Sequence, residues 1–148
     1  MQSLNITKSL RHTYTLILLP VIVLICMIYF IKIYFNISKP ETSKTVSVIL
    51  FSLSALFAIA LPIFFKLKFI NKVKNLNSIS LNDFYKFEKA IMKIALLTPY
   101  FIILSLVLNL KEFYFAGIIL MSIYACYYYF PSEKRMKFEK TIFRIKEH

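Results

Sequence analysis

Four long apolar runs constrain the fold of this chain more than any other feature of its sequence. They cover residues 14–35, 46–65, 91–110 and 113–130. A helix that rises 1.5 Å per residue needs about 20 residues to cross roughly 30 Å of hydrocarbon. The runs lack the alternation of barrel strands, and a backbone in lipid must satisfy its own hydrogen bonds, which favours helices. The sequence therefore predicts an all-α, polytopic membrane protein: an antiparallel bundle of four transmembrane helices.

The apolar content supports the same interpretation. Apolar residues make up 59% of the 148 residues, against about 45–50% in soluble globular domains. A soluble domain of this size buries only part of its surface, so it could not hide this much apolar area. A signal peptide is the alternative for the first run, but the run exceeds the usual 7–15 apolar residues and no small-x-small cleavage site follows. We expect a single membrane domain over residues 1–148 with a retained first helix.

The basic residues predict the orientation. The chain has 19 Lys and Arg residues and a net charge of +12. Fifteen of the 19 lie in the N-terminal tail, in the segment 66–93 or in the tail 131–148, whereas Lys32, Lys39, Lys44 and Lys111 lie on the other side. Positive charge in short connecting segments stays in the cytoplasm. We therefore expect cytoplasmic N- and C-termini, a cytosolic loop at 66–90 and a cytosolic tail at 131–148.

The loop 66–90 has an amphipathic first half and a helix-start signal in its second half. Its residues Leu67, Ile70, Val73 and Leu76 recur at three-residue spacing between lysines. This pattern is typical of a basic amphipathic segment in the headgroup region. Ser80 followed by an acidic residue three positions later, Asp83, resembles a capping box. We expect the third helix to start near residue 81, before the bilayer.

The tail repeats this chemistry. Pro131 should stop the fourth helix, and Ser132 is a favoured N-cap for a new one. That new helix can place Met136, Ile142 and Phe143 on one apolar side, with Phe138 and Ile145 flanking it, among six basic residues. We therefore expect it to lie on the membrane. For the loop 66–90, an interfacial anchor is favoured over a docking surface for a partner. The predicted surface for anionic lipid headgroups or a partner comprises Lys66, Lys68, Lys72, Lys74, Lys134, Arg135, Lys137, Lys140, Arg144 and Lys146.

Prolines and small residues mark bends and packing faces within the runs. Pro20, Pro62 and Pro99 each lack an N–H and should bend their helices. Small residues let helices approach closely in a membrane. The predicted packing residues are Ser54 and Ala58 in the second run and Gly117, Ser122 and Ala125 in the fourth.

Carboxylates and histidines are absent from the apolar runs. None of the four runs contains Asp, Glu or His, the residues that mark proton relays and ion paths at membrane depth. The two cysteines, Cys26 and Cys126, are expected to be buried free thiols. No nucleophile–base pair or HExxH motif occurs. The sequence predicts no enzymatic activity, no cofactor, no metal site and no nucleic-acid partner.

The C-terminal half resembles a known kind of protein. The segment 96–139, LLTPYFIILSLVLNLKEFYFAGIILMSIYACYYYFPSEKRMKFE, resembles small uncharacterised four-helix bacterial inner-membrane proteins, in which an aromatic-ended last helix precedes Pro-Ser or Pro-Thr and a charged tail. The resemblance implies the same topology in the bacterial inner membrane, and it supplies no activity.

Two functions follow as hypotheses. The first is a non-enzymatic accessory or assembly subunit that acts through its helix faces on a membrane-protein partner or a second copy. The alternative is a small transporter or lipid-handling protein that works as an oligomer. Its expected pathway comprises Ser47, Ser54, Tyr100, Ser105 and Asn109. A polar, water-accessible cavity would favour the alternative, whereas a close-packed dry bundle would exclude it.

Overall fold

The protein is all-helical in a computed structural model that describes residues 2–35, 41–74, 79–143 and 145. Helix accounts for 85% of the structure, and no strand occurs among the described residues. The elements are α1 (Gln2–Tyr34), α2 (Lys44–Ala55), the π-helical turn η1 (Leu56–Ala60), α3 (Leu61–Val73), α4 (Leu81–Ala95), α5 (Tyr100–Leu108), α6 (Glu112–Tyr128) and α7 (Glu133–Ile142). The predicted all-α class is therefore confirmed.

Three or four segments are long and apolar enough to cross a membrane. Three of them are single helical stretches, Ile6–Tyr34, Lys44–Val73 and Leu81–Leu108. The fourth is α6 together with α7, which qualifies only as a pair bent by 73°. The 17 residues of α6 extend about 26 Å at 1.5 Å per residue, slightly less than a typical hydrocarbon core.

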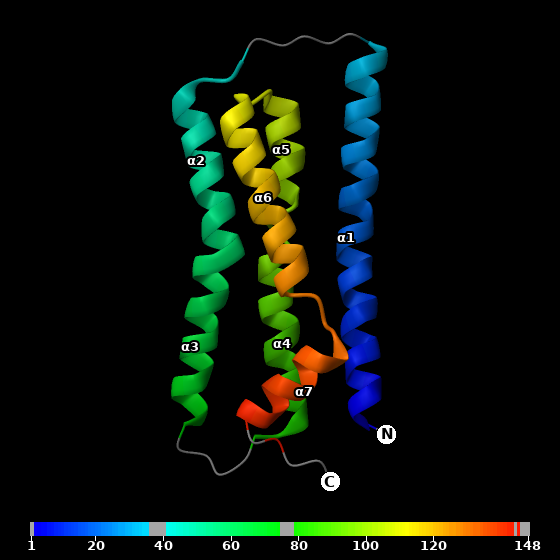
Figure 1. Ribbon diagram of the computed structural model, residues 1–148, viewed down its shortest axis with the longest axis vertical. Coiled ribbons are helices and arrows are strands. Elements are labelled where there is room, and N and C mark those ends of the chain that lie inside the picture. Colours follow the sequence, from blue (N-terminus) through cyan, green and yellow to red (C-terminus); the bar gives the residue numbers. More distant parts are fainter. Residues whose placement is uncertain (1, 36–40, 75–78, 144, 146–148) are drawn as a thin grey trace.

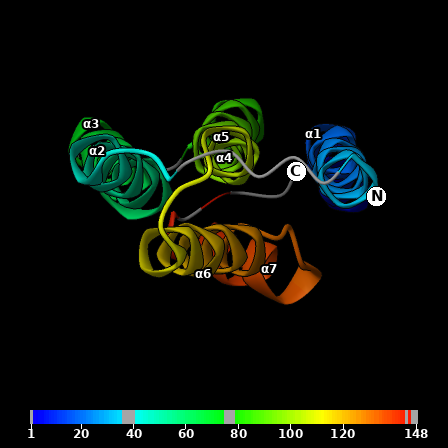
Figure 2. The ribbon, with the colours of Figure 1, turned by 90° about the horizontal axis from the view of Figure 1, so that it is seen from above.

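The helices form a row of three with the fourth segment across one face. Figure 2 shows α2–α3, α4–α5 and α1 in this row, with α6 and α7 against one side. Successive long segments run in opposite directions (Figure 1), and α7 lies at the same end as the N-terminus and the connection between α3 and α4. This end also carries the predicted cytosolic segments.

Serine side chains begin three of the helices. Ser80 Oγ accepts a hydrogen bond from the Asp83 N–H at 3.1 Å and donates to the Asp83 carboxylate at 2.8 Å. Ser132 Oγ accepts from the Arg135 N–H at 3.2 Å, and Ser43 caps α2 in the same way. Each bond satisfies an N–H that has no partner within the first turn. The predicted helix starts at residue 81 and after Ser132 are confirmed.

The segment 66–90, which connects the second and third apolar runs, is mostly helical. The helix of the second run continues as α3 to Val73, and α4 begins at Leu81. The amphipathic pattern predicted for the first half of this segment is therefore part of α3, because its apolar residues at three-residue spacing continue the helical pattern beyond the apolar run. Likewise, α1 begins at Gln2, well before its apolar run. Leu76, the last residue of the predicted amphipathic pattern, lies outside the described residues.

The three prolines have three different local effects. Pro20 lies inside the continuous helix α1. Pro62 follows η1, the wider turn that interrupts the α-helical pattern before it. Pro99 ends a turn at residues 96–99, where Thr98 N–H bonds the Ala95 carbonyl three residues back at 3.1 Å. Because proline cannot donate to the carbonyl four residues earlier, the backbone adjusts by a π turn at Pro62 and a tighter turn at Pro99.

Small residues lie where helices pack, as the sequence predicts. Ser54 and Ala58 are fully buried on the α2–α3 helix, and Ser122 and Ala125 are buried on α6. Gly117 of α6 faces the ring of Phe51 on α2. Both cysteines are free thiols, as predicted. The prediction that both are buried is wrong for Cys26, which is exposed, whereas Cys126 is partly buried. Cys26 lies on α1, which stands at the end of the row and has few neighbours to cover it (Figure 2).

Candidate functional site

A groove of about 830 Å³ between α1, α5 and α6 is the candidate site. Its volume lies in the range of about 300–1,000 Å³ that is usual for small-molecule sites. It is open to the surroundings, since Ile22 and Ile123 of its lining are exposed. The groove is lined by residues of four segments: Tyr14, Leu18, Val21, Ile22 and Ile25 of α1; Pro99 and Ile102; Ser122, Ile123, Cys126, Tyr127, Tyr128 and Phe130; and Ser132 and Arg135.

Two breaks in the helices border this groove. The chain leaves α6 after Tyr128 and turns by 73° into α7, while α1 continues straight past this point (Figure 1). The turn that ends at Pro99 separates α4 from α5, and Pro99 lines the groove. Pro131 lies between α6 and α7 and Pro99 between α4 and α5, and proline cannot continue a regular helix.

The groove is apolar over most of its length and polar at one end. Val21, Ile22 and Ile25 on α1 and Ile102 on α5 provide apolar surface. Two of its hydroxyl groups bond to backbone carbonyls: Tyr14 donates to Cys126 O at 3.0 Å, and Ser122 donates to Ile118 O at 2.8 Å. They therefore add little free polarity.

The polar end of the groove is the start of α7. Ser132 and Arg135 line the groove there. Arg135 donates from Nη2 to the Glu88 carboxylate of α4 at 2.7 Å and lies 5.5 Å from the centre of the Tyr129 ring. The Glu88 side chain is 4% exposed and that of Arg135 is 18% exposed. The site therefore combines an apolar wall with one inward-facing cation.

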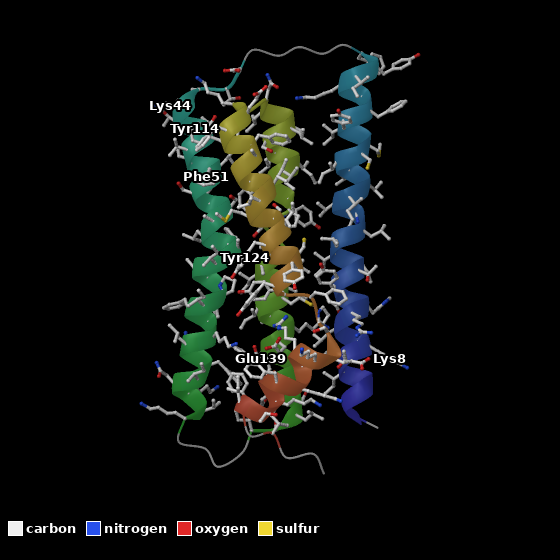
Figure 3. The ribbon with its side chains drawn as sticks, viewed as in Figure 1. Lys8, Lys44, Phe51, Tyr114, Tyr124 and Glu139 are labelled. Atoms are coloured by element: carbon white, nitrogen blue, oxygen red, sulfur yellow. The ribbon has the colours of Figure 1, made fainter. Side chains whose placement is uncertain are left out.

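A second ion pair also joins α7 to the row of helices. Lys66 of α3 donates to a carboxylate oxygen of Glu139 at 2.6 Å, and the Glu139 side chain is 7% exposed. Figure 3 places Glu139 on α7 at the end of the molecule that also carries Lys8, far from Lys44 and Tyr114. The other oxygen of Glu139 is buried and has no hydrogen-bond partner among the described residues.

Together the two pairs fix the position of α7. Removing one partner of a buried ion pair costs about 3–5 kcal/mol, because a buried charge is left uncompensated. Apolar contacts also hold α7 in place. Met136 of α7 and Phe143, which follows its last residue, belong to a buried cluster with Leu10 of α1 and Phe84 of α4. The tail helix predicted to lie on the membrane therefore packs against protein on this side, while Phe138 remains exposed.

The ten residues of the predicted lipid or partner surface have different surroundings. Lys66 and Arg135 are bound to buried carboxylates inside the molecule. Lys68, Lys72, Lys74, Lys134 and Lys137 are exposed, and Lys140 is partly buried. Arg144 and Lys146 lie outside the described residues. The exposed lysines form the part of that surface that the structure leaves available.

The expected polar pathway is not the groove. Ser47, Ser54 and Ser105 are buried and donate to carbonyls of their own helices or caps, namely Ser43 O, Phe51 O and Ile102 O. Tyr100 donates to Ile17 O at 3.4 Å, and Asn109 ends α5 in the left-handed conformation with φ 51°. None of the five lines the groove. The hydroxyl groups of the three serines and Tyr100 thus bond to backbone carbonyls, and the Asn109 side chain accepts from Lys32.

Sequence reasoning missed Glu88 and Glu139 because both lie outside the apolar runs. A signal for their burial is nevertheless present. Glu88 lies four residues after Phe84 and three before Ile91, and Glu139 lies three after Met136 and four before Phe143. Residues three or four apart share a helix face. A carboxylate in the middle of an apolar face predicts a buried, paired acid.

Within the described part of the chain, no group of three or more His, Cys, Asp and Glu residues could hold a metal ion. Comparison of the chain with family models, curated proteins and solved structures found no match.

Proposed function

We propose that this chain is a non-enzymatic, multi-pass protein of the bacterial inner membrane that holds an amphipathic lipid in the groove beside α1. The observation that carries the proposal is the groove itself, which is apolar over the length of Val21 to Ile25 and ends at Ser132 and Arg135. An apolar tail and a polar headgroup match these two regions. The exposed Ile22 and Ile123 at its opening let a lipid enter sideways.

The proposed topology places α7 in the cytosol. The three long helices and α6 form four membrane-crossing segments in an antiparallel bundle, with both termini cytoplasmic. The charge distribution supports this orientation, because the predicted cytosolic segments lie at one end of the molecule (Figure 1) and hold most of its Lys and Arg residues. Arg135 and the polar end of the groove then lie at the level of the inner-leaflet headgroups.

The test fills the groove with bulky side chains. The double variant Ile22→Trp/Ile123→Trp adds two indoles at the groove opening. The control, Val23→Trp/Leu120→Trp, adds the same two indoles on the same helices at residues that do not line the groove. The pairs are matched in exposure: Ile123 is 63% and Leu120 66% exposed, and Ile22 is 52% and Val23 48% exposed. Native mass spectrometry of protein in mild detergent counts the bound lipids.

We expect the native chain and the control pair to retain a lipid that the groove-filling pair loses. Burial of apolar chain is worth about 25 cal/mol per Å² of surface removed from water, so a blocked groove removes most of the affinity. Equal lipid retention by the two variant pairs would contradict the proposal. So would a native chain without any retained lipid.

A second candidate is the accessory or assembly subunit. It is favoured by α1, whose apolar stretch is only 6% buried and which contacts neighbours on one side of the row alone (Figure 2). Exposed aromatic residues such as Phe30 and Tyr34 offer contacts to a partner in the membrane. Native mass spectrometry of the chain at native expression tests this role. A second protein or a second copy bound to the chain supports it, and a solitary chain refutes it.

A further inference from the structure

The groove has one cation at its polar end, and that cation has spare hydrogen-bonding capacity. A guanidinium carries five N–H donors in a planar fork. Among the described residues, the side chain of Arg135 donates to one acceptor, the Glu88 carboxylate at 2.7 Å. Arg135 also lines the groove. Its remaining donors are therefore available to a ligand that occupies the groove.

The neighbouring groups favour a negative partner. Ser132 lines the groove beside Arg135 and carries a hydroxyl that can donate. Glu88 offsets the charge of Arg135, and the exposed Lys134 adds a positive charge next to Arg135 on α7. The acidic neighbour Glu133 is exposed and is paired with Arg11 at 3.6 Å. The balance of charge at this end of the groove is positive, which favours an anionic group over a zwitterionic one.

We propose that the lipid in the groove is anionic, and that Arg135 binds its headgroup phosphate while Glu88 holds and competes for the same guanidinium. This inference rests on the proposed function, whose groove supplies the site for the acyl chain. Arginine matches phosphate in geometry, and its fork can contact Glu88 and a phosphate oxygen at the same time. A zwitterionic headgroup gains less from Arg135, because its own ammonium repels the guanidinium.

The experiment measures headgroup preference. The full chain is reconstituted in vesicles of equal parts dioleoyl phosphatidylglycerol and dioleoyl phosphatidylcholine and extracted in mild detergent. Native mass spectrometry then gives the ratio of the two retained lipids. We expect the native chain to prefer the anionic lipid about fivefold, the effect of one cation near an anionic headgroup. In Ile22→Trp/Ile123→Trp the preference should vanish together with the bound lipid.

Two variants separate Arg135 from general charge. Arg135→Met/Glu88→Leu removes both buried charges at once, so the net charge is unchanged and no unpaired charge remains. It should retain lipid without the anionic preference. The control Lys137→Gln removes an exposed charge that does not line the groove, and it should keep the preference. Glu88→Gln should increase the preference, because a neutral amide holds the guanidinium less strongly.

The outcomes distinguish the two proposals. If the native chain retains no lipid, the proposed function fails. If it retains both lipids equally, or if Arg135→Met/Glu88→Leu keeps the anionic preference while its melting temperature stays near that of the native chain, this inference alone fails. Loss of the preference in Lys137→Gln would also overturn it, since the effect would then come from surface charge.

Discussion

Gly117 shows how a single missing methyl group sets the approach of two helices. A Cβ atom added at this position would lie 2.6 Å from Cε2 and 3.0 Å from Cδ2 of the Phe51 ring. That ring also contacts Tyr114, with 6.4 Å between the ring centroids, and both lie on the upper part of α2 and α6 in Figure 3. The ring can move only by disturbing this contact. Glycine is therefore the residue that permits the observed packing of α6 on α2.

We predict opposite effects of Gly117→Ala in two backgrounds. In the native chain the methyl group should lower the melting temperature in detergent, because overpacking costs about 1–3 kcal/mol. In Phe51→Leu, which makes room, the same change should raise the melting temperature, because Ala is favoured over Gly in a helix by about 1 kcal/mol. The same sign in both backgrounds would show that the ring does not limit the approach of the helices.

At the scale of one element, α7 depends on distant residues for its position. The helix start depends on a local interaction, because Ser132 Oγ accepts a hydrogen bond from the Arg135 N–H three residues later. The direction in which α7 points is set by Arg135 and Glu139, which bind carboxylate and ammonium groups on α4 and α3. A helix of 10 residues has marginal stability alone. Its contacts with the row of helices therefore hold it in place.

We predict that Lys66→Met loosens α7. The substitution leaves the Glu139 carboxylate buried with neither of its oxygens hydrogen-bonded. We expect a loss of stability of about 2–3 kcal/mol. This is less than the loss on breaking a fully buried ion pair, because the Lys66 side chain is one-third exposed. Trypsin should then cleave at Lys137 or Lys140 faster than in the native chain. Glu139→Leu in the same chain should restore protection, since it removes the uncompensated charge.

The matched control for this prediction is Lys68→Met, two residues further along α3. Lys68 is exposed, and substitutions of such surface residues usually change stability by less than about 0.5 kcal/mol. Equal sensitivity of both variants to trypsin would mean that α7 is not held by the bond between Lys66 and Glu139.

At the scale of the whole molecule, the two ends differ in charge and in structure. The end with α7 carries both buried ion pairs and the apolar cluster around Phe84. The opposite end has polar contacts between its connecting segments. Thr42 donates hydrogen bonds to the backbone carbonyls of Leu108 and Asn109. Lys32 donates to Asn109 at 3.4 Å, and Lys111 lies 3.9 Å from Glu41. A bilayer between these ends would place the charge-rich end in the cytosol.

We predict that cysteine labelling follows this orientation. In a Cys26→Ala/Cys126→Ala background, Lys111→Cys should react with a membrane-impermeant maleimide in intact cells. Lys137→Cys should react only after the membrane is permeabilised. Both lysines are exposed, so accessibility within the fold does not differ between them. The reverse pattern would refute the proposed topology, and reaction of both residues in intact cells would refute a barrier between the two ends.

The all-α fold, the apolar segments and the starts of α4 and α7 follow from the sequence alone. These features depend on local physics: apolar runs set the length of a segment, and a serine hydroxyl caps the backbone within three residues. The local rule that proline interrupts a helix fits Pro62 and Pro99, but it did not separate them from Pro20, which lies inside the continuous helix α1. Local rules did not predict how far helix extends into the segment 66–90, where α3 continues the second run to Val73.

Tertiary structure alone decided the groove and the partners of its charged residues. Arg135 meets Glu88 across 47 residues of sequence, and Lys66 meets Glu139 across 73. No periodicity encodes such pairs, because they depend on the angle between α6 and α7 and on the order of helices in the row. The sequence by itself determined which segments are helical and apolar. Only packing decided which basic residues turn inward, because burying a charge is tolerated solely where an opposite charge meets it.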